Sequence, residues 1–313
     1  MNPLVSIAIP AFNSAQWLAV AIESALGQTW PQKEVLVLDD GSTDGTATVL
    51  AGFGDRIRWE RTENRGVNHA RNRLLQMARG EWMQYLDADD FLRPEKIAAQ
   101  IREAGALDEC DVIYSPVIEE IWREGRVTSA EATFVDPKLD LYAQWFLWQL
   151  PQTGGCLWRR SLQLSLGGWD ETETVCDEHE FYQRAMRRGA RFAFAPTPGA
   201  VYRIWSEMSR CRRDERVPVA SRTRLIESLC AWMKEQGIWR ESHRRAAGRT
   251  CMEMARTLAK YDLAEAVSYH AARRTQGLIH LAGPAAPWAY RMSCRIAGFR
   301  FAELLARALR RFR

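Results

Sequence analysis

WMQYLDADD, residues 82–90, joins an apolar run typical of a buried strand to a cluster of carboxylates: Asp87, Asp89 and Asp90. Such oxygen ligands suit a hard divalent cation, which proteins often hold through one or two carboxylates together with the phosphates of a substrate. The alternative is that these acids cap the helix that follows, because Asp is common at helix N-termini. The stretches upstream favour the cation site.

Strand-like runs alternate with helical stretches in the sequence before this cluster. The strands are expected at residues 4–10, 34–38 and 56–62, and the helices at 15–27 and 67–78. This alternation indicates an α/β fold with a mostly parallel sheet and helices on both faces. Ligands of such sheets bind beyond the carboxyl ends of the strands, where polar loops are expected at residues 10–13, 39–44, 64–66 and 87–90.

The motifs in these loops resemble, in order and spacing, those of the family 2 glycosyltransferases. They are PAFN at 10–13, DDGSTD at 39–44, NRG at 64–66, ARN at 70–72, GE at 80–81 and LDADD at 86–90. The resemblance covers residues 3–209. It implies the Rossmann-like GT-A fold, a nucleotide-sugar donor that is usually UDP-linked, Mn²⁺ or Mg²⁺ as cofactor, and inversion at the anomeric carbon.

The resemblance also implies which residues bind the donor. Pro10, Phe12 and Asn13 match the loop that borders the nucleoside. Asp39 or Asp40 matches the acid that reads the base, where a carboxylate can accept a charge-assisted hydrogen bond. The other expected donor-binding residues are Asn64, Gly66, Arg71, Asp87, Ala88, Asp89 and Arg203.

Asp87 and Asp89 match the Asp-x-Asp metal motif of the family. Asp89 is expected to touch the metal, and Asp87 the ribose or a metal-bound water. The cation would neutralise charge on the leaving diphosphate. Arg71 either approaches the donor phosphates or forms a structural ion pair with Asp39 or Asp87.

An inverting transfer also requires a general base, which the family carries at an acidic pair that precedes a helix with an Arg. Here GGWDE at 167–171 is followed by Asp177, Glu178 and then Arg184. Alignment on Arg184 puts Glu178 at the catalytic position but reverses the order of the pair, so Asp177 stays an alternative. Both acids also suit the first turn of a helix expected at 178–188.

Residues 201–209, VYRIWSEMS, resemble the loop that closes over the diphosphate in many relatives. Arg203, Ser206 and Ser209 fit its pattern, but Trp205 stands where those relatives carry His. Trp205 can stack on a sugar or shield the site from water.

Acceptor recognition is expected between residues 115 and 170, where glycines at 154 and 155 let the backbone approach a ligand. Tryptophans are dense there, and core packing is the expected use of most of them: Trp122, Trp145, Trp148, Trp158 and Trp169.

Charge divides the chain into two parts. Residues 1–202 carry 20 Lys and Arg against 29 Asp and Glu, a net charge of −9, whereas residues 203–313 carry 23 against 10, a net charge of +13. We expect a catalytic domain at 1–210, with a nucleotide-sugar half at 1–110 and an acceptor half at 111–210, and a basic helical region at 211–313. Helices are expected there at 221–236, 241–261, 263–276 and from about residue 287.

The last of these helices is basic and amphipathic. Its apolar face carries Phe301, Leu304, Leu305, Ala308, Leu309 and Phe312, and arginines crowd the other face. It suits an anionic membrane surface, or it packs its apolar face on the catalytic domain. No motif for nucleic-acid binding accompanies the basic tail, so nucleic acid is not an expected partner.

No transmembrane helix and no signal peptide are expected, and seven scattered cysteines suit reduced thiols in the cytoplasm. We therefore predict a metal-dependent inverting glycosyltransferase on the cytoplasmic side, in peripheral contact with the membrane or free of it. It would move a hexosyl or N-acetylhexosaminyl group to a hydroxyl of a glycan or lipid-linked glycan in bacterial surface polysaccharide synthesis.

Two alternative functions stay open. A sugar-nucleotide nucleotidyltransferase would want a Gly-rich basic loop after the first strand, which PAFN at 10–13 does not offer. A catalytically inactive protein that binds sugar nucleotides or glycans is suggested by the reversed acidic pair and by Trp205.

Overall fold

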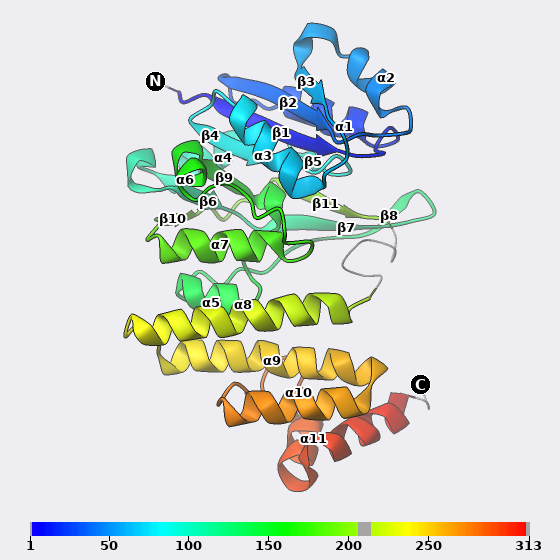
Figure 1. The fold of residues 1–313 in the computed structure, drawn as a ribbon, viewed down its shortest axis with the longest axis vertical. Coiled ribbons are helices and arrows are strands. Elements are labelled where there is room, and N and C mark those ends of the chain that lie inside the picture. The colour runs from blue at the N-terminus through cyan, green and yellow to red at the C-terminus, as the bar shows by residue number, and fades with distance from the viewer. Residues whose placement is uncertain (1, 206–213, 311–313) are drawn as a thin grey trace. The chain divides into compact units, whose positions relative to one another are not determined.

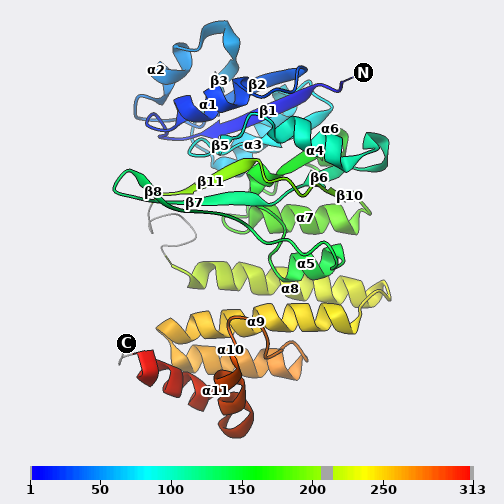
Figure 2. The same cartoon turned by 180° about the vertical axis from the view of Figure 1, so that it is seen from behind.

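A computed structural model describes residues 2–205 and 214–310 (Figures 1 and 2). The chain forms two compact units, one of residues 1–137 with 150–207 and the other of residues 138–149 with 208–313. Every predicted donor, metal and base residue lies in the first unit.

The first unit is built on a seven-stranded sheet with the order β10-β6-β9-β4-β1-β2-β3. Its strands are β1 (Val5–Ala11), β2 (Lys33–Asp39), β3 (Arg58–Arg61), β4 (Trp82–Tyr85), β6 (Val112–Tyr114), β9 (Cys156–Arg159) and β10 (Phe192–Phe194). The pairs β1–β2, β1–β4, β2–β3 and β6–β10 are parallel, whereas β9 is antiparallel to β4 and β6. The prediction of a mostly parallel sheet is confirmed.

Helices cover both faces of this sheet. They are α1 (Leu18–Leu26), α2 (Thr46–Ala51), α3 (Val67–Met77), α4 (Lys96–Ala104), α6 (Arg160–Ser165) and α7 (Asp177–Arg187). Residues of α1 and α4 share one core cluster with Ile7 and Ile9 of β1. Helix α3 also packs on β1, but its buried Leu74 and Leu75 lie outside that cluster. Because alternate residues of a strand point to opposite faces, α3 covers the other face.

A second sheet has the order β5-β11-β7-β8. Its strands are β5 (Phe91–Leu92), β7 (Val117–Arg123), β8 (Arg126–Ala132) and β11 (Ala200–Ile204). Strand β11 is antiparallel to β5, which directly follows the acidic stretch 87–90. The pairing therefore brings Arg203 to the acidic stretch. Three short 3₁₀ helices complete the unit: Gly54–Arg56, Leu107–Glu109 and Thr153–Gly155.

The second unit is helical. It contains α5 (Leu141–Phe146), α8 (Arg216–Glu235), α9 (Glu241–Tyr261), α10 (Leu263–Thr275) and α11 (Trp288–Arg310). Two of the expected helices begin at the predicted residues, 241 and 263, while α8 begins five residues before the expected 221. The last helix is not continuous, because Gly298 adopts φ 81° and ψ 170°, a conformation that glycine reaches without a Cβ clash. No helix in the described parts of the chain is both long and apolar enough to cross a membrane.

Candidate active site

The loops after β1 and β2 are tied to each other by hydrogen bonds. The Asn13 N–H donates to Ser42 Oγ at 2.9 Å, and the Thr43 N–H donates to Asn13 Oδ1 at 2.8 Å. Pro10 is buried within β1, whereas Phe12 is half-exposed. The segment expected to border a nucleoside is therefore a fixed platform with one accessible aromatic ring.

Asp39 and Asp40 lie in different environments, although both are buried. Asp40 accepts the N–H groups of Arg65 at 3.0 Å and Gly66 at 2.8 Å, so its two carboxylate oxygens hold the loop after β3. Asp39 Oδ1 accepts the Ser42 N–H at 2.9 Å. Its Oδ2 is buried and has no hydrogen-bond partner among the described residues, although Arg61 Nε lies 3.4 Å away. Asp39 thus keeps an acceptor atom that Asp40 has already used.

The loop with Asn64 packs closely against the loop after β2. A Cβ on Gly41, whose φ is 76°, would lie 2.7 Å from the Asn64 backbone nitrogen. The Asn64 side chain is exposed, and Gly66, with φ 95°, directly precedes helix α3. Glycine is required at position 41 by both its φ and this approach.

The acidic stretch after β4 brings three carboxyl groups close together. Burial, and after it the charge of Asp87, raises the pKa of Asp89 to about 6. Burial and the carboxylates of Asp89 and Asp87 raise the pKa of Asp90 well above its ordinary value. Asp90 Oδ1 accepts the backbone N–H of Arg203 at 2.8 Å, so Asp90 is held by β11. The neighbouring Ala88 is buried.

Arg203 reaches back over the acidic stretch. Its Nε donates to the backbone oxygen of Asp89. Its Nη2 is buried without a hydrogen-bond partner in the described part of the chain. A guanidinium N–H that is free beside two carboxylates is suited to an anionic ligand such as a phosphate.

The residues at this stretch fit a divalent cation. Within the described residues, no three or more His, Cys, Asp and Glu side chains converge on a common metal position. A cation held by one or two carboxylates and the phosphates of its substrate does not need three. Burial and the neighbouring carboxylate of Asp87 disfavour the charged form of Asp89, and Mn²⁺ or Mg²⁺ would stabilise that form.

Arg71 links this acidic stretch to the acidic pair. Its buried guanidinium, 4% exposed, lies 3.2 Å from Asp87 Oδ1 and 2.5 Å from Asp177 Oδ2. The ring of Trp169 packs beneath it, with 4.6 Å from the guanidinium carbon to the ring centroid. The structural ion pair with Asp87 is therefore present, whereas Asp39 lies near Arg61 instead.

The acidic pair begins α7, as expected. Asp177 and Glu178 stand in the first turn of that helix. Against the effect of burial, the Arg71 guanidinium holds the pKa of Asp177 below its ordinary value. Burial, and then the charge of Asp177, raises the pKa of Glu178 to about 7. Two neighbouring carboxyl groups with separated pKa values are typical of an acid–base site.

Thr153 connects Glu178 to Arg71, a link that the sequence did not predict. Its hydroxyl donates to Glu178 Oε1 at 2.7 Å and accepts from Arg71 Nη2 at 3.2 Å. The only sequence signal was its place before Gly154 and Gly155. An added Cβ would clash at Gly155, 2.5 Å from Pro151 Cβ, and would be tightly packed at Gly154. The tight packing of this 3₁₀ turn fixes the Thr153 hydroxyl.

Helix α3 also anchors the loop that leads to the acidic pair. Asn72 exchanges two hydrogen bonds with the backbone of Trp169, at 2.7 and 2.9 Å. Asn68 donates to the carbonyl oxygens of Asp170 and Glu173 at 2.9 and 3.0 Å. The ARN motif at 70–72 signalled Asn72, but the contact to residue 169 could not be read from it.

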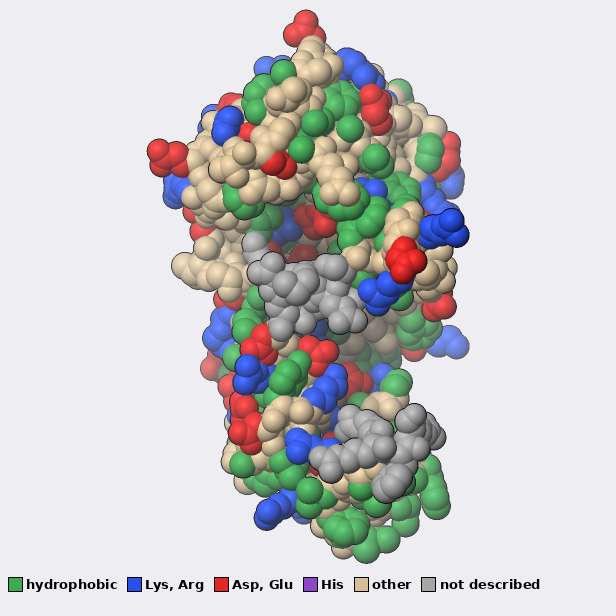
Figure 3. Space-filling view, turned by 90° about the vertical axis from the view of Figure 1, so that its right-hand side faces the viewer, with side chains coloured by type: hydrophobic (Ala, Val, Ile, Leu, Met, Phe, Trp, Pro, Cys, Tyr) green, Lys and Arg blue, Asp and Glu red, His purple; other side chains and the backbone are tan. Residues whose placement is uncertain are grey.

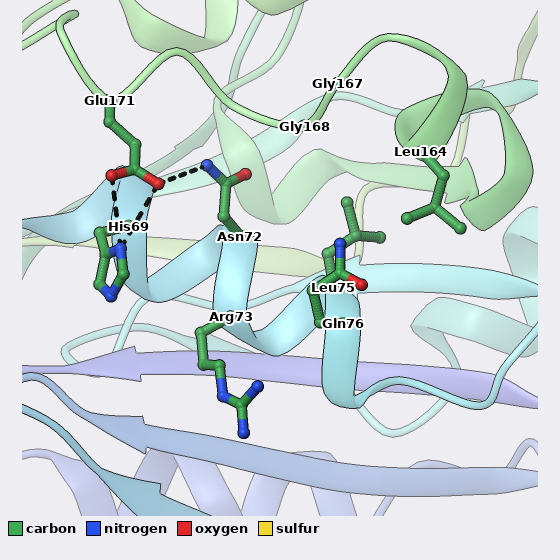
Figure 4. Close-up of a pocket in the computed structure, with 9 residues that line it drawn as sticks. All are labelled: His69, Asn72, Arg73, Leu75, Gln76, Leu164, Gly167, Gly168 and Glu171. Carbon is green, nitrogen blue, oxygen red and sulfur yellow. Dashed lines mark hydrogen bonds and ion pairs between the residues drawn. The ribbon is translucent and has the colours of Figure 1, made fainter.

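A pocket of about 330 Å³ opens beside this loop (Figure 4). It is lined by His69, Asn72, Arg73, Leu75, Gln76, Leu164, Gly167, Gly168 and Glu171. Figure 4 shows the Glu171 carboxylate pointing to His69 and Asn72, with 3.0 Å from its Oε1 to Asn72 Nδ2. The lining set contains none of the predicted donor, metal or base residues.

Trp205 packs among aromatic side chains. Its ring centroid lies 4.0 Å from that of Trp17 and 4.4 Å from that of Trp122, with the planes tilted by about 30°. The Arg203 guanidinium carbon lies 5.0 Å from the Trp205 ring. Trp205 thus supports Arg203. Ser206 and Ser209 lie outside the described residues.

The other tryptophans of the expected acceptor region are mostly core residues, as predicted. Trp145, Trp158 and Trp169 are almost fully buried. Trp122 is partly exposed, which leaves it as the one tryptophan of 115–170 in the first unit that solvent reaches appreciably. The remaining member of the set, Trp148, lies in the second unit.

Known proteins resemble this chain in sequence. The family model for glycosyl transferase family 2 matches residues 6–160. An uncharacterized glycosyltransferase of Rickettsia typhi is 42% identical over 112 residues, which is 36% of this chain and 35% of that protein. Succinoglycan biosynthesis protein ExoO of Rhizobium meliloti is 32% identical over 212 residues, 64% of this chain and 61% of ExoO. The match to the Rickettsia protein thus spans about a third of that relative's length.

Solved structures share the fold. TarS 1-349 of S. aureus in complex with UDP-GlcNAc has a TM-score of 0.55 and 15% identity, covering 88% of this chain and 89% of the 1-349 chain. The mannosyltransferase PcManGT of Pyrobaculum calidifontis in complex with GDP-Man and Mn²⁺ has a TM-score of 0.58 and 20% identity, covering 99% and 87%. At these identities the likeness concerns the fold, and it confirms the expected GT-A-like architecture. The match over residues 6–160 and the glycosyltransferase relatives show that the chain belongs to glycosyl transferase family 2.

Proposed function

We propose that this chain transfers a sugar from a nucleoside-diphosphate donor to a hydroxyl group of a glycan or lipid-linked glycan, with inversion at the anomeric carbon. The observation that carries the proposal is that the pKa values of the acidic pair, Asp177 and Glu178, are shifted in opposite directions. Arg71 holds Asp177 as an anion, while Glu178 keeps a pKa of about 7. A base that titrates near neutral pH can both accept and release a proton there.

The chemistry is a single displacement. The acceptor oxygen attacks the anomeric carbon, the bond from that carbon to the diphosphate oxygen breaks, and Glu178 takes the proton of the acceptor hydroxyl. Asp177 is the weaker candidate for the base because its Oδ2 already contacts Arg71 at 2.5 Å. Its charge instead raises the proton affinity of Glu178.

Asp89 and Asp87 are the proposed metal ligands, with Asp89 in direct contact. Bound Mn²⁺ or Mg²⁺ would neutralise charge on the leaving diphosphate. Arg203 offers its unpartnered Nη2 to the same phosphates. Arg71 orients the Asp87 carboxylate, with 3.2 Å between Arg71 Nη2 and Asp87 Oδ1.

We propose that Asp39 hydrogen-bonds the nucleoside base and that the Phe12 ring borders the nucleoside. Asp39 Oδ2 can accept the imide N–H of uracil, whereas both Asp40 oxygens hold the loop after β3. Thymine carries the same imide N–H, so this acceptor suits a UDP- or a dTDP-linked donor, and the family resemblance favours UDP. The UDP-GlcNAc and GDP-Man complexes of TarS and PcManGT support a nucleotide-sugar donor in general.

The proposed setting is bacterial surface polysaccharide synthesis at the cytoplasmic side of a membrane. The relative ExoO is a succinoglycan biosynthesis protein, which supports such a pathway. The described cysteines, Cys110, Cys156, Cys176, Cys230, Cys251 and Cys294, are all free thiols. Free thiols are in keeping with a reducing compartment.

Calorimetric titration with UDP, dTDP and GDP, each with and without Mn²⁺, tests the donor site. We expect UDP to bind, and more tightly with Mn²⁺. The Asp89→Ala variant should lose the Mn²⁺ dependence and keep the weaker metal-free binding. Absence of binding by all three nucleotides would contradict the base-reading and metal assignments together.

A further inference from the structure

Helix α11 turns its apolar face outward. Six large hydrophobic side chains of this helix are exposed: Trp288, Ile296, Phe301, Leu304, Leu305 and Leu309. The highest exposed fractions are 79% for Ile296, 70% for Trp288 and 62% for Leu309. Figure 3 shows hydrophobic side chains gathered over the part of the second unit that α11 forms. We call these six residues the α11 patch.

The inner face of the same helix is mixed and includes a buried carboxylate. Phe299 and Ala302 are buried, and Glu303 is fully buried between Arg256 Nε at 2.8 Å and Tyr290 Oη at 2.6 Å. Arg307 donates to the backbone oxygen of Ala259. A surface helix normally buries its apolar stripe and exposes its polar one. Helix α11 instead leaves six large apolar side chains exposed in the described part of the chain.

The segment that carries the α11 patch is strongly basic. Residues 284–313 contain seven arginines and one carboxylate, Glu303, which is already paired with Arg256. Arg295 and Arg300 are exposed, Arg291 is partly exposed, and none of the three has an ion pair within the described residues. The surface therefore combines exposed Trp, Phe and Leu with arginines that have no ion-pair partner among the residues the structure describes.

We propose that the α11 patch is a docking surface for an anionic lipid membrane, in which α11 lies in the interface plane without crossing it. Apolar side chains would enter the acyl boundary while the arginines contact the headgroups. The break at Gly298 divides the helix, and each half carries exposed apolar side chains, with Ile296 before the break and Phe301 after it. A second copy of this chain is the other candidate occupant, but its own arginines would repel those of the first copy.

Sedimentation of the whole chain with vesicles tests this proposal. One set of vesicles is phosphatidylcholine alone, and the other contains phosphatidylcholine and phosphatidylglycerol in equal parts. We expect binding to the second set, and its loss as salt is raised, because exposed charges are screened. The double variant Ile296→Ser, Leu309→Ser should bind at least about tenfold more weakly. Arg295→Gln should weaken binding to the anionic vesicles about fivefold.

Phe134→Ser is the matched control, because Phe134 is 72% exposed but lies in the first unit. It should bind vesicles like the wild type. Equal vesicle binding by the double variant, or no binding by the wild type, would overturn the proposal. So would a dimer of the wild type that the double variant converts to a monomer, since the patch would then be an interface between copies. Nucleotide titration of the same variants reports on the donor site separately, so failure of either proposal is seen on its own.

Discussion

The Thr153 hydroxyl donates a hydrogen bond of 2.7 Å to Glu178 Oε1. The same hydroxyl accepts one from Arg71 Nη2 at 3.2 Å. A single buried side chain thus joins the proposed base to the guanidinium that holds Asp87 and Asp177. The proposed metal site and the proposed base are therefore parts of one connected network.

Thr153→Val should raise the pKa of Glu178 by about one unit, because the lost hydrogen bond stabilises the carboxylate. Thr153→Ser should restore the wild-type value, since it keeps the hydroxyl. The pKa is measured by ¹³C NMR on protein labelled at glutamate Cδ, with the Glu178 signal assigned from Glu178→Gln. An unchanged pKa in the valine variant would mean that Thr153 only packs.

The transfer rate should rise with pH through about 7, because only the Glu178 carboxylate can take a proton. Below that pH the rate should fall about tenfold per unit. The measurement is kcat across pH 5 to 9 on saturating donor. A rate independent of pH between about 6 and 8 would contradict the assignment of the base.

Glu178→Gln should stabilise the fold at high pH. The pKa of Glu178 is raised in the folded state, from 4.5 to about 7, so the protonated form favours folding. That contribution is complete below pH 4.5 and is lost as the pH rises through 7. At pH 8 the variant should exceed the wild type by about 1–3 kcal/mol in free energy of unfolding, and at pH 4 by much less. Urea denaturation at pH 4 and pH 8 measures the free energy of unfolding of variant and wild type. The same difference between the two proteins at both pH values would contradict the prediction.

Arg71→Met should destabilise the chain by about 3–5 kcal/mol, because Asp87 and Asp177 lose the buried cation between them. Arg73→Met is the matched control on the same helix. Arg73 pairs with Glu60 at 2.7 Å in solvent, and exposed pairs contribute about 0–1 kcal/mol. Equal losses for the two variants in urea denaturation would show that the Arg71 network adds nothing.

Gly168→Ala should disturb the loop before the acidic pair, whereas Gly167→Ala should disturb it far less. Both glycines have φ near 80°, so both substitutions carry backbone strain. Only the Cβ at 168 meets another atom, Asn72 Oδ1 at 2.4 Å, while nothing lies within 4 Å at 167. Thermal unfolding should show the larger loss for Gly168→Ala. Similar losses would mean that the Asn72 anchor is dispensable.

Local patterns in the sequence accounted for much of the fold. Apolar runs ending in polar loops marked β1, β2 and β4, and the structure places these strands within one residue of the expected ends. The spacing of Phe301, Leu304 and Leu305 marked a single apolar face on α11. Periodicity shows that a face exists but not what covers it, so its outward orientation required the structure.

Contacts between residues far apart in the chain could not be predicted from the sequence. Thr153 and Glu178 are 25 residues apart, and Asn72 and Trp169 are 97 apart. Each pair meets only because α3, the Thr153–Gly155 turn and α7 pack around the Arg71 guanidinium. The choice between Asp39 and Asp40 was open for the same reason, since their different partners come from separate loops.

Turnover of the acidic-pair variants tests the central claim most directly. The donor is a sugar linked to whichever nucleotide binds in the titration, and simple glycosides serve as acceptors. We follow the release of nucleoside diphosphate for wild type, Glu178→Gln and Asp177→Asn, and we measure donor binding for each. We predict that Glu178→Gln binds donor like the wild type but turns over at least about 10²-fold more slowly. A near-normal rate for Glu178→Gln, or a wild type that binds the donor and never turns it over, would contradict the account.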